Sequence, residues 1–454
     1  MKPAISVFAT AGLLLLNIAC AIELNVDDPA SIKSAAKTIA GGLRTWYTGD
    51  KLGDVPGNLP DPYFWWLCGA MFGSFIDYWH YTGDDTYNAI TTQALVHQIG
   101  TPQAFMPPNQ TSTLGNDDQA FWGMSAMSAA ENKLPDVNGQ MSWLSLAIAV
   151  FNTQVPRWNN KTCGGGLNWQ IFTFNRGFDY KNTISNGAFF NIAARLGKYT
   201  RNDTYIEWAN KAWDWQKSVG LIGENYQFYD GTSERQNCTT LNHIQWSYNA
   251  GIHMSGAAAL WNLVKQAALW RERLRRIIQS TEVFFSQDGA PNVMIEIACE
   301  RNGLCDHDQR SFKAYLSRWM GWTVLTAPWT RELIMPRLRA SAVAAAKQCS
   351  GGANGNTCGL RWWQNGQNDG EVGVGEQMSA LEVIQNLLVD QTPGPVSEQT
   401  GGISKNDPSA GTDARDMNFD FDHITTGDRV GAGILTTVVL AGMFSGSWWL
   451  IRGD

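Results

Sequence analysis

Two adjacent carboxylates, Asp117 and Asp118, are the residues of this sequence with the clearest capacity for chemistry. They lie in Leu114-Gly-Asn-Asp-Asp-Gln-Ala-Phe-Trp-Gly123, where a polar loop changes into an apolar, alanine-rich run. Asn116 is a good helix N-cap, so both aspartates are predicted in the first turn of a helix. The helix dipole stabilises acidic side chains in this turn, and this alone would explain the aspartate pair in purely structural terms. A carboxylate pair that points from a helix end into a cleft can instead supply a nucleophile and a proton donor.

The composition restricts the class of protein. Of 454 residues 17% are charged, and the formal net charge is -7. This charge and the lack of a basic run argue against nucleic-acid binding. The 21 tryptophans can form core and also stacking surfaces for sugar rings. No CxxC or CxxH spacing indicates a zinc site, and we expect no metal, no other cofactor and a monomeric chain.

Both ends of the chain carry apolar segments. Residues 1–21 fit a secretory signal that ends at Ala19-Cys-Ala21. Val430 to Ile451 could span a bilayer. Because this run stops three residues before the terminus, we favour the removable tail of a glycosylphosphatidylinositol (GPI) signal. The best attachment site, Ser409-Ala-Gly-Thr412, lies farther upstream than usual. We expect a secreted protein on the outer face of the plasma membrane, held by a lipid anchor, or in the cell wall.

Sequons and cysteines agree with export. N-glycosylation is predicted at Asn109, Asn160, Asn202 and Asn237. Cys20 leaves with the signal, so seven cysteines remain and one thiol stays unpaired. Cys68 lies in an apolar helical run and is the predicted free thiol. The predicted disulfides are Cys299–Cys305 and Cys349–Cys358, each across a short loop, and Cys163–Cys238 between two long loops.

Helical periodicity recurs along the chain, with little strand-like alternation. Twelve helices are predicted, at 31–48, 65–82, 84–99, 116–131, 142–156, 183–199, 203–219, 245–265, 269–286, 309–326, 330–347 and 374–390. Long loops rich in glycine, asparagine and proline alternate with short links, and short links make antiparallel helix pairs. Six pairs with every long loop at one end predict an all-α fold, an (α/α)6 barrel.

Five helices that follow long loops are rich in glycine, alanine and aromatic residues and poor in charge. This composition is typical of inner helices, which are packed on nearly all sides. They are 65–81, 116–130, 183–196, 246–261 and 374–388. Their starts face the long-loop end, so the aspartate pair is predicted at the floor of a cleft there. The domain boundaries follow as a signal at 1–21, the barrel at 22–392, a linker at 393–429 and the tail at 430–454.

Aromatic and amide residues gather at the same end of the predicted barrel. The candidate substrate-binding residues are Trp65, Trp66, Asn116, Trp122, Asn186, Tyr248, Asn249, Trp362, Trp363 and Gln364. Gly164-Gly-Gly-Leu-Asn-Trp-Gln170 is a further stretch of this kind. Aromatic faces stack on pyranose rings and amides bind hydroxyls. The same residues can be core or turn formers, because periodicity does not separate a cleft wall from a core. Helix capping adequately explains Asp306-His-Asp308.

The chain resembles glycoside hydrolase family 76, the α-1,6-mannanases, and in particular its fungal cell-wall members. The match rests on the aspartate pair within Gly115-Asn-Asp-Asp-Gln-Ala-Phe-Trp-Gly123. Asn186-Gly-Ala188, Tyr248-Asn-Ala-Gly251 and Trp362-Trp-Gln-Asn365 support it. The resemblance covers roughly residues 22–390 and implies an (α/α)6 barrel and a retaining mechanism. In that mechanism Asp117 would be the nucleophile and Asp118 the general acid/base.

The fungal members are linked to attaching GPI-anchored mannoproteins to wall glucan. The resemblance therefore implies an endo-α-1,6-mannosidase or transglycosidase. Its donor would be an α-1,6-linked mannoside or a GPI-core glycan, and its acceptor a β-glucan or water. At the start of this helix, we expect the helix dipole to keep Asp117 ionised. The charge of Asp117 should then raise the pKa of Asp118. The alternatives are a non-catalytic mannan- or glucan-binding wall protein, and a cation site at the aspartate pair.

Overall fold

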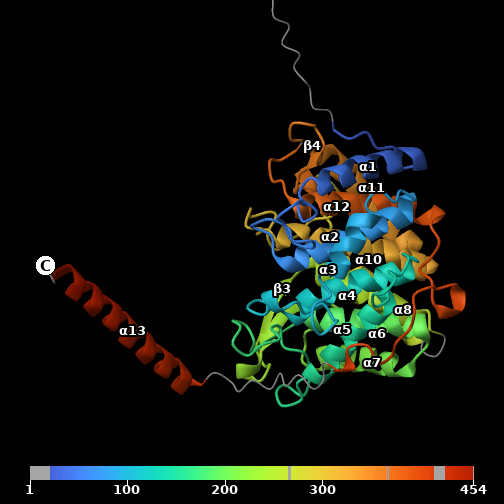
Figure 1. Cartoon of the computed structure of the whole chain (residues 1–454). Coiled ribbons are helices and arrows are strands. Elements are labelled where there is room, and N and C mark those ends of the chain that lie inside the picture. The colour runs from blue at the N-terminus through green and yellow to red at the C-terminus, as the bar shows by residue number, and fades with distance from the viewer. Residues whose placement is uncertain (1–20, 264–266, 365, 367, 414–424, 453–454) are drawn as a thin grey trace, which may run out of the picture.

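The computed structural model describes residues 21–263, 267–364, 366, 368–413 and 425–452. The predicted secretory signal lies almost wholly outside the described residues. The twelve predicted helices are all present (Figure 1). They are α1 (Pro29–Arg44), α2 (Trp65–Thr82), α3 (Asn88–His97), α4 (Asn116–Glu131), α5 (Trp143–Gln154), α6 (Thr183–Thr200), α7 (Asp203–Ser218), α8 (Ser247–Trp261), α9 (Ala267–Ser280), α10 (Phe312–Thr326), α11 (Arg331–Gln348) and α12 (Val374–Gln385).

Six of these helices form a closed inner ring. The helices α2, α4, α6, α8, α10 and α12 each pack against the next, and α12 packs against α2. The outer helices α1, α3, α5, α7, α9 and α11 cover them, for example α7 on α6 and α9 on α8. This arrangement is the predicted (α/α)6 barrel, with α10 as the sixth inner helix.

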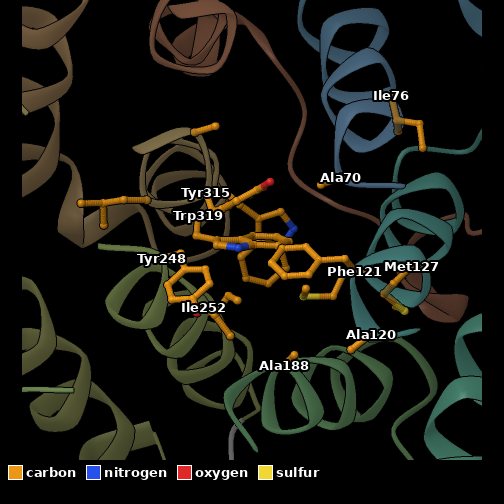
Figure 2. Packing of buried hydrophobic residues seen from close by; sticks show 14 of the residues in the cluster. Ala70, Ile76, Ala120, Phe121, Met127, Ala188, Tyr248, Ile252, Tyr315 and Trp319 are labelled. Carbon is orange, nitrogen blue, oxygen red and sulfur yellow. The ribbon is translucent and has the colours of Figure 1, made fainter. Parts of the chain in front are cut away.

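The two kinds of helix differ as their composition predicts. In α6 every residue from Thr183 to Tyr199 is buried, because the helix is surrounded by its neighbours. In α9 the buried residues are Trp270, Leu274, Ile277 and Ile278, which recur at helical spacing and leave a charged face in solvent. Figure 2 shows Phe121 of α4, Tyr248 of α8 and Trp319 of α10 converging on the centre of the ring.

Three of the long loops contain strands that the sequence did not reveal. β1 (Tyr180–Asn182) and β3 (Leu241–Gln245) flank β2 (Tyr229–Ser233) in an antiparallel sheet of order β1-β2-β3. A small hairpin joins β4 (Cys349–Gly351) and β5 (Thr357–Cys358). The larger sheet ties the loop before α6 to the loop before α8. It therefore forms a rigid wall at the long-loop end of the barrel.

The disulfides reinforce these loops as predicted. Cys163 is bonded to Cys238, which joins the same two loops that share the sheet. Cys299–Cys305 and Cys349–Cys358 close their short loops. Cys68 is a buried free thiol in α2. The cysteine assignments made from spacing are therefore confirmed.

The segment at 393–412, here called the C-terminal strap, corrects the predicted domain boundary. It was expected to be the first part of a linker, but it is docked on the barrel. Val396 N donates to Glu131 O at 3.0 Å, and the Asn152 side-chain amide donates to Pro408 O and Ala410 O at 3.0 and 2.8 Å. Ala410 is buried, so the expected attachment site Ser409–Thr412 lies against α5. The catalytic-domain boundary therefore belongs after Thr412, because these backbone groups find their partners on the barrel.

The C-terminal apolar run forms helix α13 (Thr426–Arg452). This helix is exposed along its whole length and lies apart from the barrel in Figure 1. Within the described part of the chain, it is the one helix that is long and apolar enough to cross a membrane.

Candidate active site

A cavity of about 200 Å³ opens at the long-loop end of the barrel. The residues that line it come from the starts of α2, α4, α8 and α10 and from the sheet wall. They are Trp66, Asp117, Asp118, Phe121, Trp169, Tyr180, Asn182, Asp230, Tyr248, Asp308 and Phe312. The aspartate pair therefore lies in a cleft at the predicted end of the barrel.

Local capping at the start of α4 fixes the position of Asp118. The N-cap is Gly115 rather than the predicted Asn116, so the helix begins one residue earlier, at Asn116. Gly115 N donates to Asp118 Oδ2 at 2.6 Å, which is the acidic half of a capping box. Asn116 instead bonds the loop before the sheet: its amide donates to Asn168 O at 2.8 Å, and its oxygen accepts from Arg157 at 2.7 Å.

Burial controls the protonation of the pair. Burial raises the pKa of Asp117 to about 7, while nearby backbone N–H groups and the Ser185 and Asn182 side chains lower it. Burial, and then the charge of Asp117, raise the pKa of Asp118 well above its ordinary value. The helix start was expected to keep Asp117 ionised; its backbone N–H groups do lower the pKa, but burial outweighs them. The order of ionisation is nevertheless as expected: Asp117 loses its proton first and Asp118 keeps one longer.

The two carboxyl groups also differ in their hydrogen bonds. Asp118 is held by the Gly115 N–H. Asp117 Oδ1 is buried and has no hydrogen-bond partner among the described residues. Asp117 Oδ1 faces Gly115, and the Asp117 residue lines the cavity. An ionised carboxylate on a cavity wall can attack an electrophilic carbon, whereas a protonated neighbour can give its proton to a leaving oxygen. The arrangement can therefore perform nucleophilic displacement with acid assistance.

Two further carboxylates enter the cavity from other elements. Asp230 of β2 accepts from Tyr180 Oη at 2.6 Å, Trp246 Nε1 at 3.0 Å and the Asn242 amide at 3.0 Å, and burial raises its pKa. Burial and the charges of Asp306 and Asp118 raise the pKa of Asp308 to about 7. Among the described residues no lysine or arginine lines the cavity. The site therefore favours ligands that carry hydroxyls or a positive charge.

Aromatic rings form the apolar part of the wall. The ring of Tyr248 stacks on Phe312 with centroids 3.8 Å apart and planes 12° apart. Trp66 packs against Phe121 at 4.6 Å, and Phe121 packs in turn against Tyr315 at 4.9 Å (Figure 2). These contacts fix the rings, so that the wall is preformed for the C–H face of a sugar.

Of the ten candidate substrate-binding residues, the structure places Trp66 and Tyr248 on the cavity wall. Trp65 and Trp122 stack on one another in the core at 5.1 Å. Trp362 is fully buried and donates to Gly359 O at 3.1 Å. Neighbouring residues at a helix start point in different directions, so Trp66 reaches the cavity while Trp65 fills the core.

The remaining amide and aromatic candidates also lie away from the cavity wall. Asn186 is buried and bonds the backbone of Leu167 in both directions, at 2.8 and 3.0 Å. Asn249 is buried behind the wall, and neither atom of its amide has a partner among the described residues. Trp363 lies under Arg301, and Gln364 is exposed in a short 3-10 helix. Asn186 therefore holds a loop, and none of these four residues lines the cavity.

Sequence reasoning missed most of the wall opposite the aspartate pair. Tyr180, Asn182 and Asp230 belong to the unpredicted sheet. Asp308 was assigned to helix capping, which is correct for Asp306, whose Oδ1 accepts from Gln309 N at 2.9 Å, but not for Asp308. The segments 229–233 and 241–245 are short and mostly polar, and neither shows the apolar-polar alternation that identifies a strand. The four sequon asparagines are exposed, at Asn109, Asn160, Asn202 and Asn237.

Comparison with known proteins identifies the family. The family model described as "Glycosyl hydrolase family 76" matches residues 31–399. The chain is 46% identical to the mannan endo-1,6-alpha-mannosidase DCW1 of Eremothecium gossypii over 98% of this chain and 99% of the relative. It is 46% identical to the Saccharomyces cerevisiae protein of that name over 95% of each chain.

A solved structure gives the same result. The crystal structure of Dfg5 from Chaetomium thermophilum in complex with glucosamine superposes with a TM-score of 0.83 at 42% identity, over 87% of this chain and 99% of that one. The likeness therefore extends through both the sequence and the barrel. On this evidence the chain is a glycosidase and belongs to glycosyl hydrolase family 76.

Proposed function

We propose that this chain is a retaining endo-α-1,6-mannosidase that also transfers the glycosyl group to a sugar acceptor. The observation that carries the proposal is that Asp117 and Asp118 lie side by side on the cavity wall, and that the charge of Asp117 adds to the burial that raises the pKa of Asp118. The names of relatives that match nearly the whole chain support the α-1,6-mannoside as substrate.

The first step assigns one role to each aspartate. The Asp117 carboxylate attacks the anomeric carbon, so that a bond to the enzyme forms as the bond to the leaving oxygen breaks. Asp118 gives its proton to that oxygen. In the second step Asp118 takes a proton from water or a sugar hydroxyl, whose oxygen displaces Asp117. The two displacements together retain the anomeric configuration.

Gly115 leaves the space that both carboxyl groups occupy. A Cβ atom at this position would lie 2.3 Å from Asp117 Oδ1 and 3.1 Å from Asp118 Oδ2. The backbone of Gly115 has φ -93°, which every residue adopts without strain. A side chain there would therefore act on the carboxyl groups and not on the backbone conformation.

We propose a GPI-core glycan as the donor in preference to plain mannan. Asp230 and Asp308 bring the number of carboxyl groups on the cavity wall to four, and no described lysine or arginine balances them. An unacetylated glucosamine carries an ammonium group, and the GPI core contains this sugar beside mannose. The Chaetomium relative has been crystallised with glucosamine. Charge complementarity therefore supports an amino sugar near the reacting mannose.

We also propose that the protein works at the cell surface, on a lipid anchor, and that a wall β-glucan is the acceptor. The apolar, fully exposed helix α13 supports removal of the tail on lipid attachment. The exposed sequons support passage through the secretory pathway. Because Ser409–Thr412 is docked on α5, we place the attachment site after the C-terminal strap. The rival function is a non-catalytic glycan-binding wall protein, which needs the aromatic wall but not the aspartates.

Substitution of each aspartate tests the mechanism. With a dinitrophenyl glycoside of α-1,6-mannobiose, Asp117→Asn should lose nearly all activity, and azide should not restore it. Asp118→Ala should still release dinitrophenol, because this leaving group needs no proton, and azide should accelerate turnover to a glycosyl azide of retained configuration. Nuclear magnetic resonance identifies the product. Azide rescue of Asp117→Asn alone would reverse the two roles, and full activity of both variants would leave the glycan-binding function.

Gly115→Ala tests whether the pair must keep its position. The added methyl group should displace the Asp117 carboxyl group and lower kcat by about 100-fold, the scale for displacement of a catalytic group by near 1 Å. Gly41→Ala in α1 is the matched control, since an added Cβ atom there would lie 3.8 Å from Tyr87 Oη, an ordinary van der Waals contact. That variant should keep full activity and gain about 0.5–1 kcal/mol in the free energy of unfolding. Wild-type kcat in Gly115→Ala would contradict the assigned geometry.

Acetylation of the donor tests the amino-sugar proposal. A GPI-core fragment with a free glucosamine amine should react with a higher kcat/KM than its N-acetyl counterpart, by about tenfold at low salt, because the ammonium charge is attracted to the carboxyl groups. Asp308→Asn should reduce the difference between the two donors. Equal kcat/KM for both donors would favour plain α-1,6-mannan as the substrate.

Enzymatic release from membranes tests the anchor. A phosphatidylinositol-specific phospholipase should transfer the mature protein from the membrane fraction to the supernatant, because the lipid alone holds it there. Mass spectrometry of the released protein should find peptides of the C-terminal strap and none from α13. Protein that leaves the membrane only in detergent, with α13 still attached, would establish a spanning helix instead.

A further inference from the structure

Trp169 occupies the solvent end of the cavity. Its side chain is 36% exposed, and it is the most exposed of the residues that line the cavity. Phe121 and Tyr248, in contrast, are buried. It belongs to the long loop between α5 and β1, beyond the helices that carry the aspartates. The cavity therefore has a buried aromatic part beside Asp117 and an exposed aromatic ring at its mouth.

The backbone of Trp169 is fixed between the two walls of the cavity. Trp169 O accepts from Asn116 N at 2.8 Å, directly beside the aspartate pair. Trp169 N donates to Tyr180 O at 2.6 Å, on the sheet wall that carries Asp230. These bonds hold the ring in place relative to the aspartates, although the residue lies in a long loop.

One side of the Trp169 ring is closed and the rest is open. A Cβ atom on Gly177 would lie 2.5 Å from Trp169 Cε3 and 2.7 Å from Cζ3, so this glycine packs directly against the six-membered ring. Gly177 has φ +90°, which favours glycine at this position. Trp169 Nε1 donates to no protein group within the described residues, in contrast to Trp246 Nε1, which bonds Asp230. The ring is supported by Gly177 on one side, and its other side and its N–H group are open. Such a ring is suited to stack on a sugar ring and to donate a hydrogen bond to a hydroxyl.

We propose that Trp169 is the platform for the leaving sugar and then for the acceptor sugar, and that it favours transfer over hydrolysis. This inference rests on the proposed two-step function. In the second step the bond from C1 to Asp117 breaks, the bond from C1 to the acceptor oxygen forms, and the hydroxyl proton goes to Asp118. The acceptor must enter from solvent through the place that the leaving sugar has vacated. Trp169 lies at that entrance, and its stacking holds a pyranose there in preference to water.

The test distinguishes a role of Trp169 in donor cleavage from a role in binding the leaving and acceptor sugars. The dinitrophenyl glycoside of α-1,6-mannobiose has no leaving sugar, so the first release of dinitrophenol should change less than twofold in Trp169→Ala. With laminaritriose as acceptor, the ratio of transfer product to hydrolysis product should fall about tenfold, the scale of one lost aromatic stacking contact. With α-1,6-mannotetraose as donor, whose leaving group is a sugar, kcat/KM should fall by a similar factor.

Two variants serve as controls. Phe174→Ala removes a 50% exposed ring of the same loop that does not line the cavity, and it should leave every ratio unchanged. Trp169→Phe should recover part of the transfer ratio. An unchanged transfer ratio and unchanged kcat/KM for mannotetraose in Trp169→Ala would overturn the inference. Equal loss of dinitrophenol release would place Trp169 on the donor side instead. A wild-type protein that cleaves neither donor would overturn the proposed function itself.

Discussion

The burial of two neighbouring carboxyl groups is the constraint on which the rest of this structure depends. Removal from water opposes ionisation, and two adjacent charges oppose it further, so the pair shares its protons unequally. Burial raises the pKa of both groups, and the charge of Asp117 adds to the shift of Asp118. The start of α4 reduces the cost of this burial, because the Gly115 N–H donates a hydrogen bond to Asp118. Because Gly115 has no side chain, both carboxyl groups fit beside it. The proposed reactivity of the pair depends on an environment in which no described lysine or arginine on the cavity wall is a partner of either carboxyl group.

The long loops complete that environment because they are joined to each other. β1 and β3 lie on either side of β2, and the Cys163–Cys238 disulfide crosses between the same two loops. Asp230 thereby faces the aspartate pair, although more than one hundred residues separate them in the chain. Its three hydrogen-bond donors, from Tyr180, Trp246 and Asn242, keep the carboxyl group in place. A rigid wall on loops lets the barrel keep a simple helical core while the wall supplies polar contacts.

The barrel and the aspartate pair were predictable from sequence, whereas the composition of the cavity wall mostly was not. Inner and outer helices differ in composition because one kind is surrounded by protein and the other meets solvent, and this difference is visible in α6 and α9. Trp65 and Trp66 are chemically identical neighbours, and only the direction of each side chain decides that Trp66 lines the cavity. Asp230 is in a short polar strand that lacks the alternation by which strands are identified. The C-terminal strap was missed for a related reason, since its docking depends on backbone carbonyls, which every sequence contains.

The barrel contains buried carboxylates of two kinds. One kind is paired with arginine, and the other, the aspartate pair, is not, among the described residues. Glu131 is bonded to Arg195 at 2.7 Å and Glu382 to Arg318 at 2.7 Å, in pairs that link α4 to α6 and α12 to α10. Both pairs lie well along the inner helices, where breaking a pair would leave an uncompensated buried charge. At the helix starts, Asp117 and Asp118 have only dipoles and neutral donors around them. A cation placed there would hold both groups ionised and remove the proton that the leaving oxygen requires. The absence of a described lysine or arginine from the cavity wall is therefore part of the chemistry, as the arginines deeper in the barrel are part of the fold.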